Sequence, residues 1–242
     1  GSRYLQSIIK ERLNCNIIVV DINKNSIKNC KNIWIKNGGS TSSYKINWLS
    51  NLPNDIKSYD LAIISTSSKD RASLIKIISS KANVKNWLLE KILAQSNDQL
   101  EIIKKAVISS EKVYVNMSRR NMDWFKKIKS LIPKRPIRVE KIGTLWNLAC
   151  NSLHFIDLVS WWTEESLISI NTENLNNKWF ESKRKGYFEV TGTLLAKFSN
   201  GSELVLKSLS EKANDTFKIN ILDKNFCNIY EHTGRAIFSN GD

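Results

Sequence analysis

Glu90 and Lys91 are residues whose types and position in the chain could do chemistry. They follow an apolar segment, Val84–Leu89, that predicts a buried strand, and a segment with helical spacing comes after them. In an α/β protein, ligands bind outside the carboxyl ends of the strands. A lysine at that place could hydrogen-bond a substrate hydroxyl and stabilise negative charge that develops on its oxygen. An ordinary surface lysine paired with Glu90 is the alternative.

A second polar group, residues 151–157, holds His154, one of only two histidines in the chain. An imidazole titrates near neutral pH, so His154 could accept the proton that leaves an alcohol during its oxidation. Asp157 comes three residues later, on the same face of a helix, and could orient the ring. Asn151 could contact a substrate or cap the helix. A hydrogen-bonded histidine in the core is the alternative for His154.

The elements that would position Lys91 alternate between strand and helix. Such alternation predicts βαβ units and a parallel sheet. The expected strands are Cys15–Asp21, Ser43–Trp48, Tyr59–Thr66, Val84–Leu89 and Lys112–Asn116, and the expected helices are Ser2–Leu13, Asn25–Lys36, Asp70–Lys81 and Ser96–Ser109.

Strand patterns dominate the second half of the chain. Asn200-Gly201 lies between two alternating runs and predicts a hairpin. We expect helices at Asn121–Leu131 and Leu148–Trp162, and strands at Ile137–Thr144, Phe188–Phe198, Glu203–Leu209, Phe217–Leu222 and Asn225–Tyr230. The fold class is therefore α/β: a domain with a parallel sheet over residues 1–118, followed by an α+β domain with a mostly antiparallel open sheet over 119–242.

The composition is ordinary for a globular protein, with 41% hydrophobic and 25% charged residues. No apolar run approaches the ~20 residues that span a bilayer, so no membrane partner is expected. The net charge is +14, but most of the basic residues are lysines spread along the chain. Nucleic-acid-binding proteins usually concentrate such charge on one face. We interpret the charge as a solvated surface and do not expect nucleic acid as a partner; attraction of an anionic substrate is the alternative.

The four cysteines are far apart in the sequence and form no C-x-x-C pair. This spacing indicates neither a metal site nor a redox pair. Reduced thiols favour a cytoplasmic protein.

An ordered set of motifs resembles the Gfo/Idh/MocA (glucose–fructose oxidoreductase/inositol dehydrogenase) family of nicotinamide-dependent oxidoreductases. Gly1-Ser2-Arg3 resembles the end of its glycine-rich turn, and Val19-Val20-Asp21 resembles the start of its adenosine-binding loop. Ile64-Ser65-Thr66 resembles the loop under the nicotinamide, and Glu90-Lys91-Ile92 resembles the Glu-Lys-Pro motif. Asn116–Arg120 resembles the N-x-x-R-R segment, and Leu153–Asp157 resembles the H-x-x-D helix.

The resemblance implies a Rossmann-like NAD(P)-binding domain over residues 1–118, incomplete at its N-terminus because its first strand is missing. It implies a substrate and oligomerisation domain over 119–242, with the last hairpin cut short. The implied catalytic residues are Lys91, His154 and Asp157; the cofactor-binding residues are Gly1, Asp21, Ser65, Thr66, Glu90 and Lys91; the substrate-binding residues are Arg120, Asn151 and His154.

The implied reaction is hydride transfer between a nicotinamide and a hydroxyl-bearing carbon of a sugar, sugar nucleotide or polyol. The Asp21 carboxylate could accept both ribose hydroxyls and would repel a 2′-phosphate, so NAD is favoured and NADP stays possible. Homo-oligomers through the second sheet are implied as well. Residues around 171–185 would form a loop that decides specificity.

Two departures from the family pattern leave other functions open. Ile92 stands where the family has proline, and Cys150 stands where many members have an aspartate. They motivate a non-catalytic cofactor-binding sensor or regulator on the same fold. The net charge motivates a basic nucleic-acid-binding protein. Because a missing strand would leave its neighbours unpaired, we also expect the isolated chain to be unstable or inactive.

Overall fold

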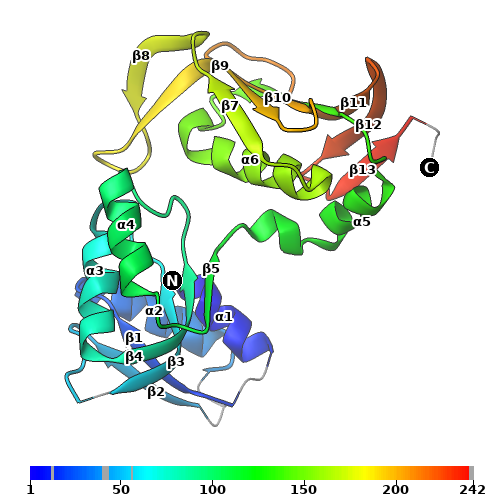
Figure 1. The fold of residues 1–242 in the computed structure, drawn as a ribbon. Coiled ribbons are helices and arrows are strands. Elements are labelled where there is room, and N and C mark those ends of the chain that lie inside the picture. The colour runs from blue at the N-terminus through cyan, green and yellow to red at the C-terminus, as the bar shows by residue number, and fades with distance from the viewer. Residues whose placement is uncertain (12–13, 40–43, 56, 240–242) are drawn as a thin grey trace. The chain divides into compact units, whose positions relative to one another are not determined.

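The computed structural model describes residues 1–11, 14–39, 44–55 and 57–239. The chain divides into two compact units, Gly1–Asn116 and Met117–Asp242. In the first unit strands and helices alternate, as the sequence predicts (Figure 1). Its elements are α1 (Ser2–Lys10), β1 (Asn16–Val20), α2 (Lys24–Lys36), β2 (Lys45–Leu49), β3 (Ser58–Ile64), α3 (Ser68–Lys81), β4 (Asn83–Leu89), α4 (Asn97–Ala106) and β5 (Lys112–Val115).

All strand pairs of this unit are parallel within the described residues, which confirms the predicted α/β class. They form two sheets, β1–β2 and β3–β4–β5. The ends of two predicted elements, Leu13 and Ser43, lie outside the described residues.

The first unit buries its apolar strand residues against the helices. Trp87 of β4 and Ile75 of α3 are fully buried, and Ile103 of α4 packs in the same cluster. A smaller cluster around Trp34 joins α1 and α2 to β1. Three residues of β4 are buried, while β3 and β5 keep exposed positions, so these strands are less buried than their apolar runs predict.

The second unit is built around an eight-stranded sheet. The sheet order is β13-β12-β11-β6-β10-β9-β7, with β8 also paired to β9. Among the described strand pairs of this sheet, only β6 and β10 run parallel, so the predicted, mostly antiparallel sheet is confirmed. The elements are a 3₁₀ turn η2 (Ser118–Asn121), α5 (Asp123–Leu131), β6 (Arg138–Thr144), α6 (Leu148–Thr163), β7 (Leu167–Asn171), β8 (Leu175–Glu181), β9 (Phe188–Phe198), β10 (Glu203–Leu209), β11 (Thr216–Ile221), β12 (Lys224–Tyr230) and β13 (Arg235–Phe238).

The hairpin predicted at Asn200-Gly201 is confirmed, because β9 and β10 pair across it and Gly201 has φ +85°. Three strands, β7, β8 and β13, were not predicted. The segment 171–185, which we expected to be a loop, instead contains β8, which pairs antiparallel with the start of β9 and has a register shift between Leu175 and Trp179.

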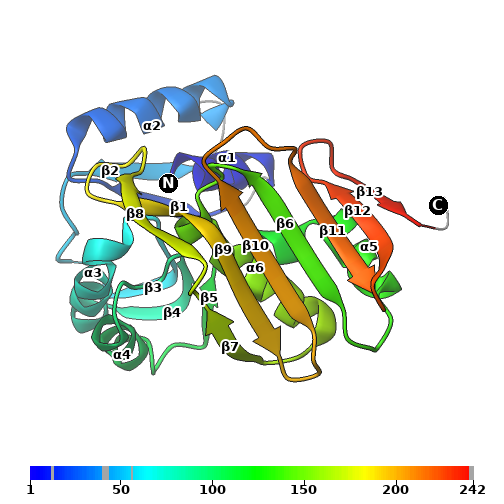
Figure 2. The same cartoon turned by 90° about the horizontal axis from the view of Figure 1, so that it is seen from above.

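Helix α6 covers one face of the large sheet together with α5 (Figure 2). Phe155, Leu158 and Val159 of α6 are fully buried against it. On the strands, buried and less buried residues alternate, as in β10. The other face of the sheet therefore carries the partly exposed set of side chains.

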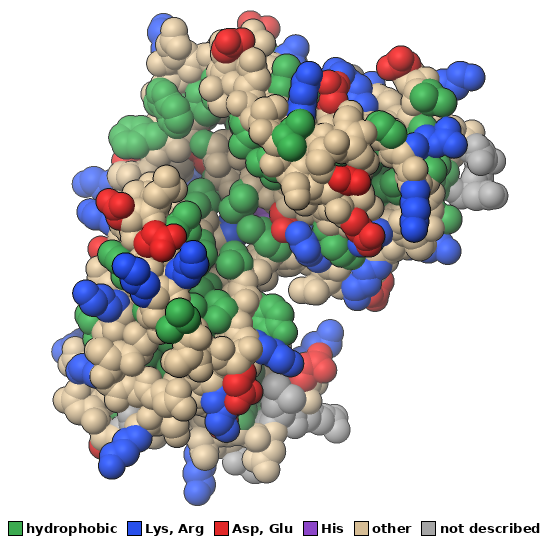
Figure 3. Space-filling view, viewed as in Figure 1, with side chains coloured by type: hydrophobic (Ala, Val, Ile, Leu, Met, Phe, Trp, Pro, Cys, Tyr) green, Lys and Arg blue, Asp and Glu red, His purple; other side chains and the backbone are tan. Residues whose placement is uncertain are grey.

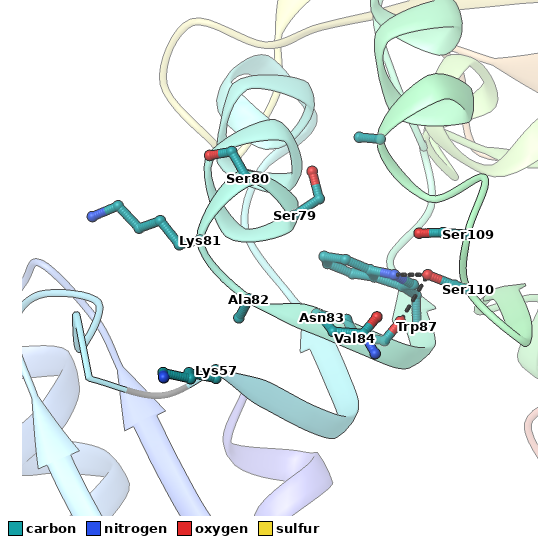
Figure 4. Close-up of a pocket in the computed structure, with 11 residues that line it drawn as sticks. Lys57, Ser79, Ser80, Lys81, Ala82, Asn83, Val84, Trp87, Ser109 and Ser110 are labelled. Atoms are coloured by element: carbon teal, nitrogen blue, oxygen red, sulfur yellow. Dashed lines mark hydrogen bonds between the residues drawn. The ribbon is translucent and has the colours of Figure 1, made fainter.

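A pocket of about 330 Å³ lies at the amino ends of β3, β4 and β5 (Figure 4). There the indole Nε1 of Trp87 donates to the Ser110 hydroxyl over 2.8 Å, and that hydroxyl donates to the Val84 carbonyl. None of the predicted site residues lines this pocket. No helix in the described part of the chain is long and apolar enough to cross a membrane.

Candidate active site

Four predicted cofactor residues follow the carboxyl ends of two adjacent strands. Ser65 and Thr66 come directly after β3, while Glu90 and Lys91 come directly after β4. The strands run parallel with Ile64 beside Leu89, and the Glu90 N–H donates to the Ile64 carbonyl over 3.1 Å. The two loops therefore start side by side at one edge of the sheet, where α/β proteins bind ligands.

The buried side chain of Arg71 forms hydrogen bonds with both loops. Its side chain comes from the first turns of α3 and only 1% of the residue is exposed. The guanidinium Nη1 donates to the carbonyls of Glu90 (2.6 Å), Ile92 and Leu93 (3.2 Å), and Nη2 donates to the carbonyl of Thr66. Sequence reasoning missed this residue. The signal was present, since Arg71 lies on the apolar face of its helix, at helical spacing from Ile75 and Ile78.

The Glu90 carboxylate points into its own unit. The Tyr4 hydroxyl donates to Glu90 Oε1, and Asn116 Nδ2 donates to the same oxygen over 3.0 Å and to the Tyr4 hydroxyl over 2.8 Å. Burial alone would raise the pKa of Glu90, but the hydrogen bonds from Tyr4 and Asn116, with the charge of Arg71, outweigh it, so the pKa is lowered. The pKa of Tyr4 is raised, first by burial and then by its bond to Glu90. Glu90 thus joins α1 and the end of β5 to the turn that holds Lys91.

Lys91 itself is half-buried at this turn. The peptide bond between Lys91 and Ile92 is cis, although residue 92 is not a proline. Its neighbours in sequence are held on both sides, Glu90 by Tyr4 and Asn116, and Ile92 by Arg71.

Gly1 lies at the start of helix α1, and Asp21 lies at the end of strand β1. Gly1 caps α1, and a Cβ atom added to it would come within 3.1 Å of the Ser65 hydroxyl. Asp21 follows β1; its N–H donates to the Leu49 carbonyl and its Oδ1 accepts from the Asn23 N–H at 2.8 Å. Gly1 and Ser65 are thus brought together, as two residues of one cofactor site would be.

In the second unit the structure joins Arg120 to Asp157. Arg120 Nε donates to Asp157 Oδ2 over 2.7 Å and Nη2 donates to Oδ1 over 2.5 Å. The Asp157 side chain is 15% exposed and that of Arg120 is 41% exposed. Both carboxylate oxygens of Asp157 are thus engaged by Arg120, a pairing that the sequence analysis did not foresee. The expected roles of Asp157 toward His154 and of Arg120 toward a substrate stay predictions.

The start of α6 is fixed by two side chains. Asn151 Nδ2 donates to the Trp146 carbonyl over 2.8 Å; the N-cap of α6 is Asn147, so Asn151 is not the capping residue. The buried Glu189 of β9 accepts hydrogen bonds from the N–H groups of Ala149 (2.9 Å) and Cys150 (3.3 Å). A carboxylate at a helix N-terminus satisfies its unpaired N–H groups and complements its dipole. Together they set the position of the helix that carries His154, one turn further on.

Basic side chains are dispersed on one face of the molecule. On the face drawn in Figure 3, lysine and arginine side chains lie among acidic and uncharged ones rather than in one patch. This distribution differs from the concentrated basic face typical of nucleic-acid-binding proteins.

The sequence matches no protein-family profile, and it matches no curated protein sequence. Solved structures of similar fold do exist. An oxidoreductase domain protein from Kribbella flavida has a TM-score of 0.64 at 12% identity, over 100% of this chain and 74% of that one. The WlbA dehydrogenase from Chromobacterium violaceum, solved with NADH and UDP-GlcNAcA, has a TM-score of 0.64 at 16% identity, over 93% and 69%.

A scyllo-inositol dehydrogenase from Lactobacillus casei, solved without ligand, has a TM-score of 0.59 at 14% identity, over 93% of this chain and 70% of that one. The similar structures are thus oxidoreductases and dehydrogenases of the type that the motifs resemble. The likeness shows their fold, with a Rossmann-type domain followed by an α+β domain. The predicted fold is therefore confirmed by an independent comparison.

Proposed function

We propose that this protein is an NAD(P)-dependent oxidoreductase that transfers hydride between the nicotinamide and a hydroxyl-bearing carbon of a sugar, sugar nucleotide or polyol. One observation carries the proposal. In a fold shared with dehydrogenases, Ser65, Thr66, Glu90 and Lys91 lie at the carboxyl ends of two adjacent parallel strands. That is the edge at which such sheets bind ligands.

The residues present fit a dinucleotide. Gly1 leaves the space beside the Ser65 hydroxyl that a Cβ atom would fill, and α1 begins there with its unpaired N–H groups. A pyrophosphate is stabilised at such a helix N-terminus. Asp21 ends β1 with a carboxylate that could accept hydrogen bonds from ribose hydroxyls, so we propose NAD ahead of NADP.

The nicotinamide supplies hydride transfer when it is bound. The chain must then handle a proton, and we assign that task to Lys91 and His154. Lys91 would hydrogen-bond the substrate oxygen and stabilise its developing negative charge, while His154 would accept the proton. Arg120, anchored by Asp157, would bind an anionic group of the substrate through the part of its side chain that stays exposed.

The substrate class rests on the solved structures of similar fold. One of them holds UDP-GlcNAcA, a sugar nucleotide, and another is an inositol dehydrogenase. An anionic substrate would also be attracted by a chain with net charge +14.

A titration of NADH and NADPH, followed by thermal shift, tests the cofactor. We expect a saturable rise in melting temperature that is larger for NADH. In Asp21→Ser the preference should shrink or reverse, because the carboxylate that repels a 2′-phosphate is gone. Asp223→Asn, in a surface turn with φ +59° that asparagine tolerates, is the matched control for loss of one negative charge. A well-folded protein without any shift would refute the proposed cofactor.

A substrate screen with sugar nucleotides and polyols tests the reaction. Lys91→Ala and His154→Ala should each lose turnover while NADH binding by His154→Ala persists. Unchanged turnover in both variants would refute their assignment. NADH binding without turnover on any substrate would favour the non-catalytic sensor, and steeply salt-dependent binding of DNA would favour the nucleic-acid alternative.

We also propose a cytoplasmic homo-oligomer that uses the open face of the second sheet. A chain of ion pairs crosses that face: Lys218–Glu140, Glu140–Arg138 and Arg138–Glu203. Charges of both signs on neighbouring strands can pair with a second copy. Sedimentation velocity over a range of protein concentrations measures the state, and a monomer at all concentrations would refute it.

A further inference from the structure

Arg71 is a charged side chain that the proposed chemistry does not use and that the fold nevertheless buries almost completely. Burying a cation is unfavourable unless it is paired and hydrogen-bonded. Its guanidinium donates to four main-chain carbonyls, those of Thr66, Glu90, Ile92 and Leu93. Nη1 shares its two N–H groups among the carbonyls of Glu90, Ile92 and Leu93, while Nη2 bonds the Thr66 carbonyl.

The four carbonyls belong to two separate loops. Thr66 lies in the loop from β3 to α3, and Glu90, Ile92 and Leu93 lie in the turn after β4. One rigid guanidinium therefore joins the two loops beyond the point where the Glu90 N–H bonds the Ile64 carbonyl. The three carbonyls after β4 lie on either side of Lys91, so the backbone of that lysine is held before and after it.

The same turn carries a negative charge at Glu90. Its carboxylate is held by Tyr4 and Asn116, and these hydrogen bonds, together with the charge of Arg71, outweigh burial and lower its pKa. The turn after β4 is thus fixed by a cation from α3 and through an anion that is tied to α1 and the end of β5. A buried charge whose hydrogen bonds reach two loops favours one arrangement of those loops.

We propose that Arg71 is a positioning residue that fixes Lys91 relative to Thr66 and so forms the nicotinamide side of the site. This inference rests on the proposed function. A lysine at position 71 would keep the charge but has a single nitrogen, which cannot bond two loops through a planar fork. The structure therefore assigns the role to the guanidinium geometry and not to the charge.

The test compares Arg71→Lys and Arg71→Gln with Trp87→Phe. Trp87→Phe is the matched control, because it removes a buried hydrogen bond to Ser110 at the opposite ends of the same strands (Figure 4). For each variant the melting temperature, the Kd for NADH and the rate of acetylation of Lys91 relative to the exposed Lys57 are measured, the last by mass spectrometry. The acetylation ratio needs no cofactor.

We expect the Arg71 variants to bind NADH about tenfold or more weakly and to change the Lys91 acetylation ratio. Trp87→Phe should lower the melting temperature and leave both other measurements at the wild-type level. Equal effects of all three variants, or misfolding of both Arg71 variants while Trp87→Phe folds, would overturn a positioning role. If the wild-type protein binds no NADH, the proposed function fails, and the acetylation ratio alone then decides the role of Arg71.

Discussion

Because Tyr4 of α1 is hydrogen-bonded to Glu90 and Asn116, we expect loss of its hydroxyl to lower the free energy of unfolding. Tyr4→Phe keeps the ring and removes only the hydroxyl, which donates to Glu90 and accepts from Asn116. A hydrogen bond to a charged group contributes about 1.5–3 kcal/mol, and a neutral one about 1 kcal/mol. Since the three side chains are only half-buried, we expect a total loss of about 2–3 kcal/mol from the free energy of unfolding.

Urea unfolding at pH 7 measures this loss. Tyr114→Phe is the matched control, since Tyr114 of β5 is 57% exposed and makes no hydrogen bond through its hydroxyl with the described residues. It should change the free energy of unfolding by less than about 0.5 kcal/mol. Equal effects of the two substitutions would refute the reasoning.

The pH dependence gives the same prediction a second test. The pKa of Glu90 is lowered in the folded protein, so its contribution is present above the unfolded pKa of ~4.3 and is lost as the pH falls through the folded value. Tyr4→Phe removes one cause of that lowering. The difference in unfolding free energy between wild type and Tyr4→Phe should therefore be full at pH 7 and shrink below about pH 4. A difference that stays constant down to pH 3 would show that Glu90 is not ionised in this bond.

Three further predictions follow from other contacts. Gly192→Ala should cost about 2–3 kcal/mol in urea unfolding, because Gly192 has φ +114° and an added Cβ would lie 2.5 Å from the Asn174 carbonyl oxygen; no loss would contradict the strain. Glu189→Ala should cost about 1–2 kcal/mol by leaving the first turn of α6 uncapped, and an unchanged midpoint would argue against the cap. A double-mutant cycle with Arg120→Met and Asp157→Asn should give a coupling of about 1 kcal/mol, and strict additivity would show that the pair contributes nothing.

The sequence pattern predicted the strands that have apolar runs, and the strands it missed include two that are almost fully exposed. Val84, Trp87 and Leu89 of β4 are buried against the helices, so the burial of that strand is visible in its residue types. All five residues of β7 are exposed, and β8 is exposed at six of its seven positions. Strands without a buried face carry no alternation, and their pairing with β9 is fixed by that neighbour instead.

Part of the candidate site could be predicted from the sequence, and part could not. The edge that gathers Ser65, Thr66, Glu90 and Lys91 follows from the topology of a parallel sheet, so it could be predicted from the order of the elements. The partners of Glu90 could not, because Tyr4 lies 86 residues away in the sequence and no local rule connects them. The pairing of Arg120 with Asp157, 37 residues apart, was hidden for the same reason.

Residue 92 is isoleucine where the family motif has proline, and Arg71 restrains the backbone at this place instead. The proline that the family motif carries after its lysine would restrict the backbone from within, through its ring. Here residue 92 is isoleucine, and the carbonyls of Ile92 and Leu93 are instead held from outside by the Arg71 guanidinium. The turn is also restrained at Glu90, whose carboxylate is bonded to Tyr4 and Asn116. A turn restrained by bonds from three other elements can keep its lysine in place without a ring, so Ile92 is by itself no argument against catalysis.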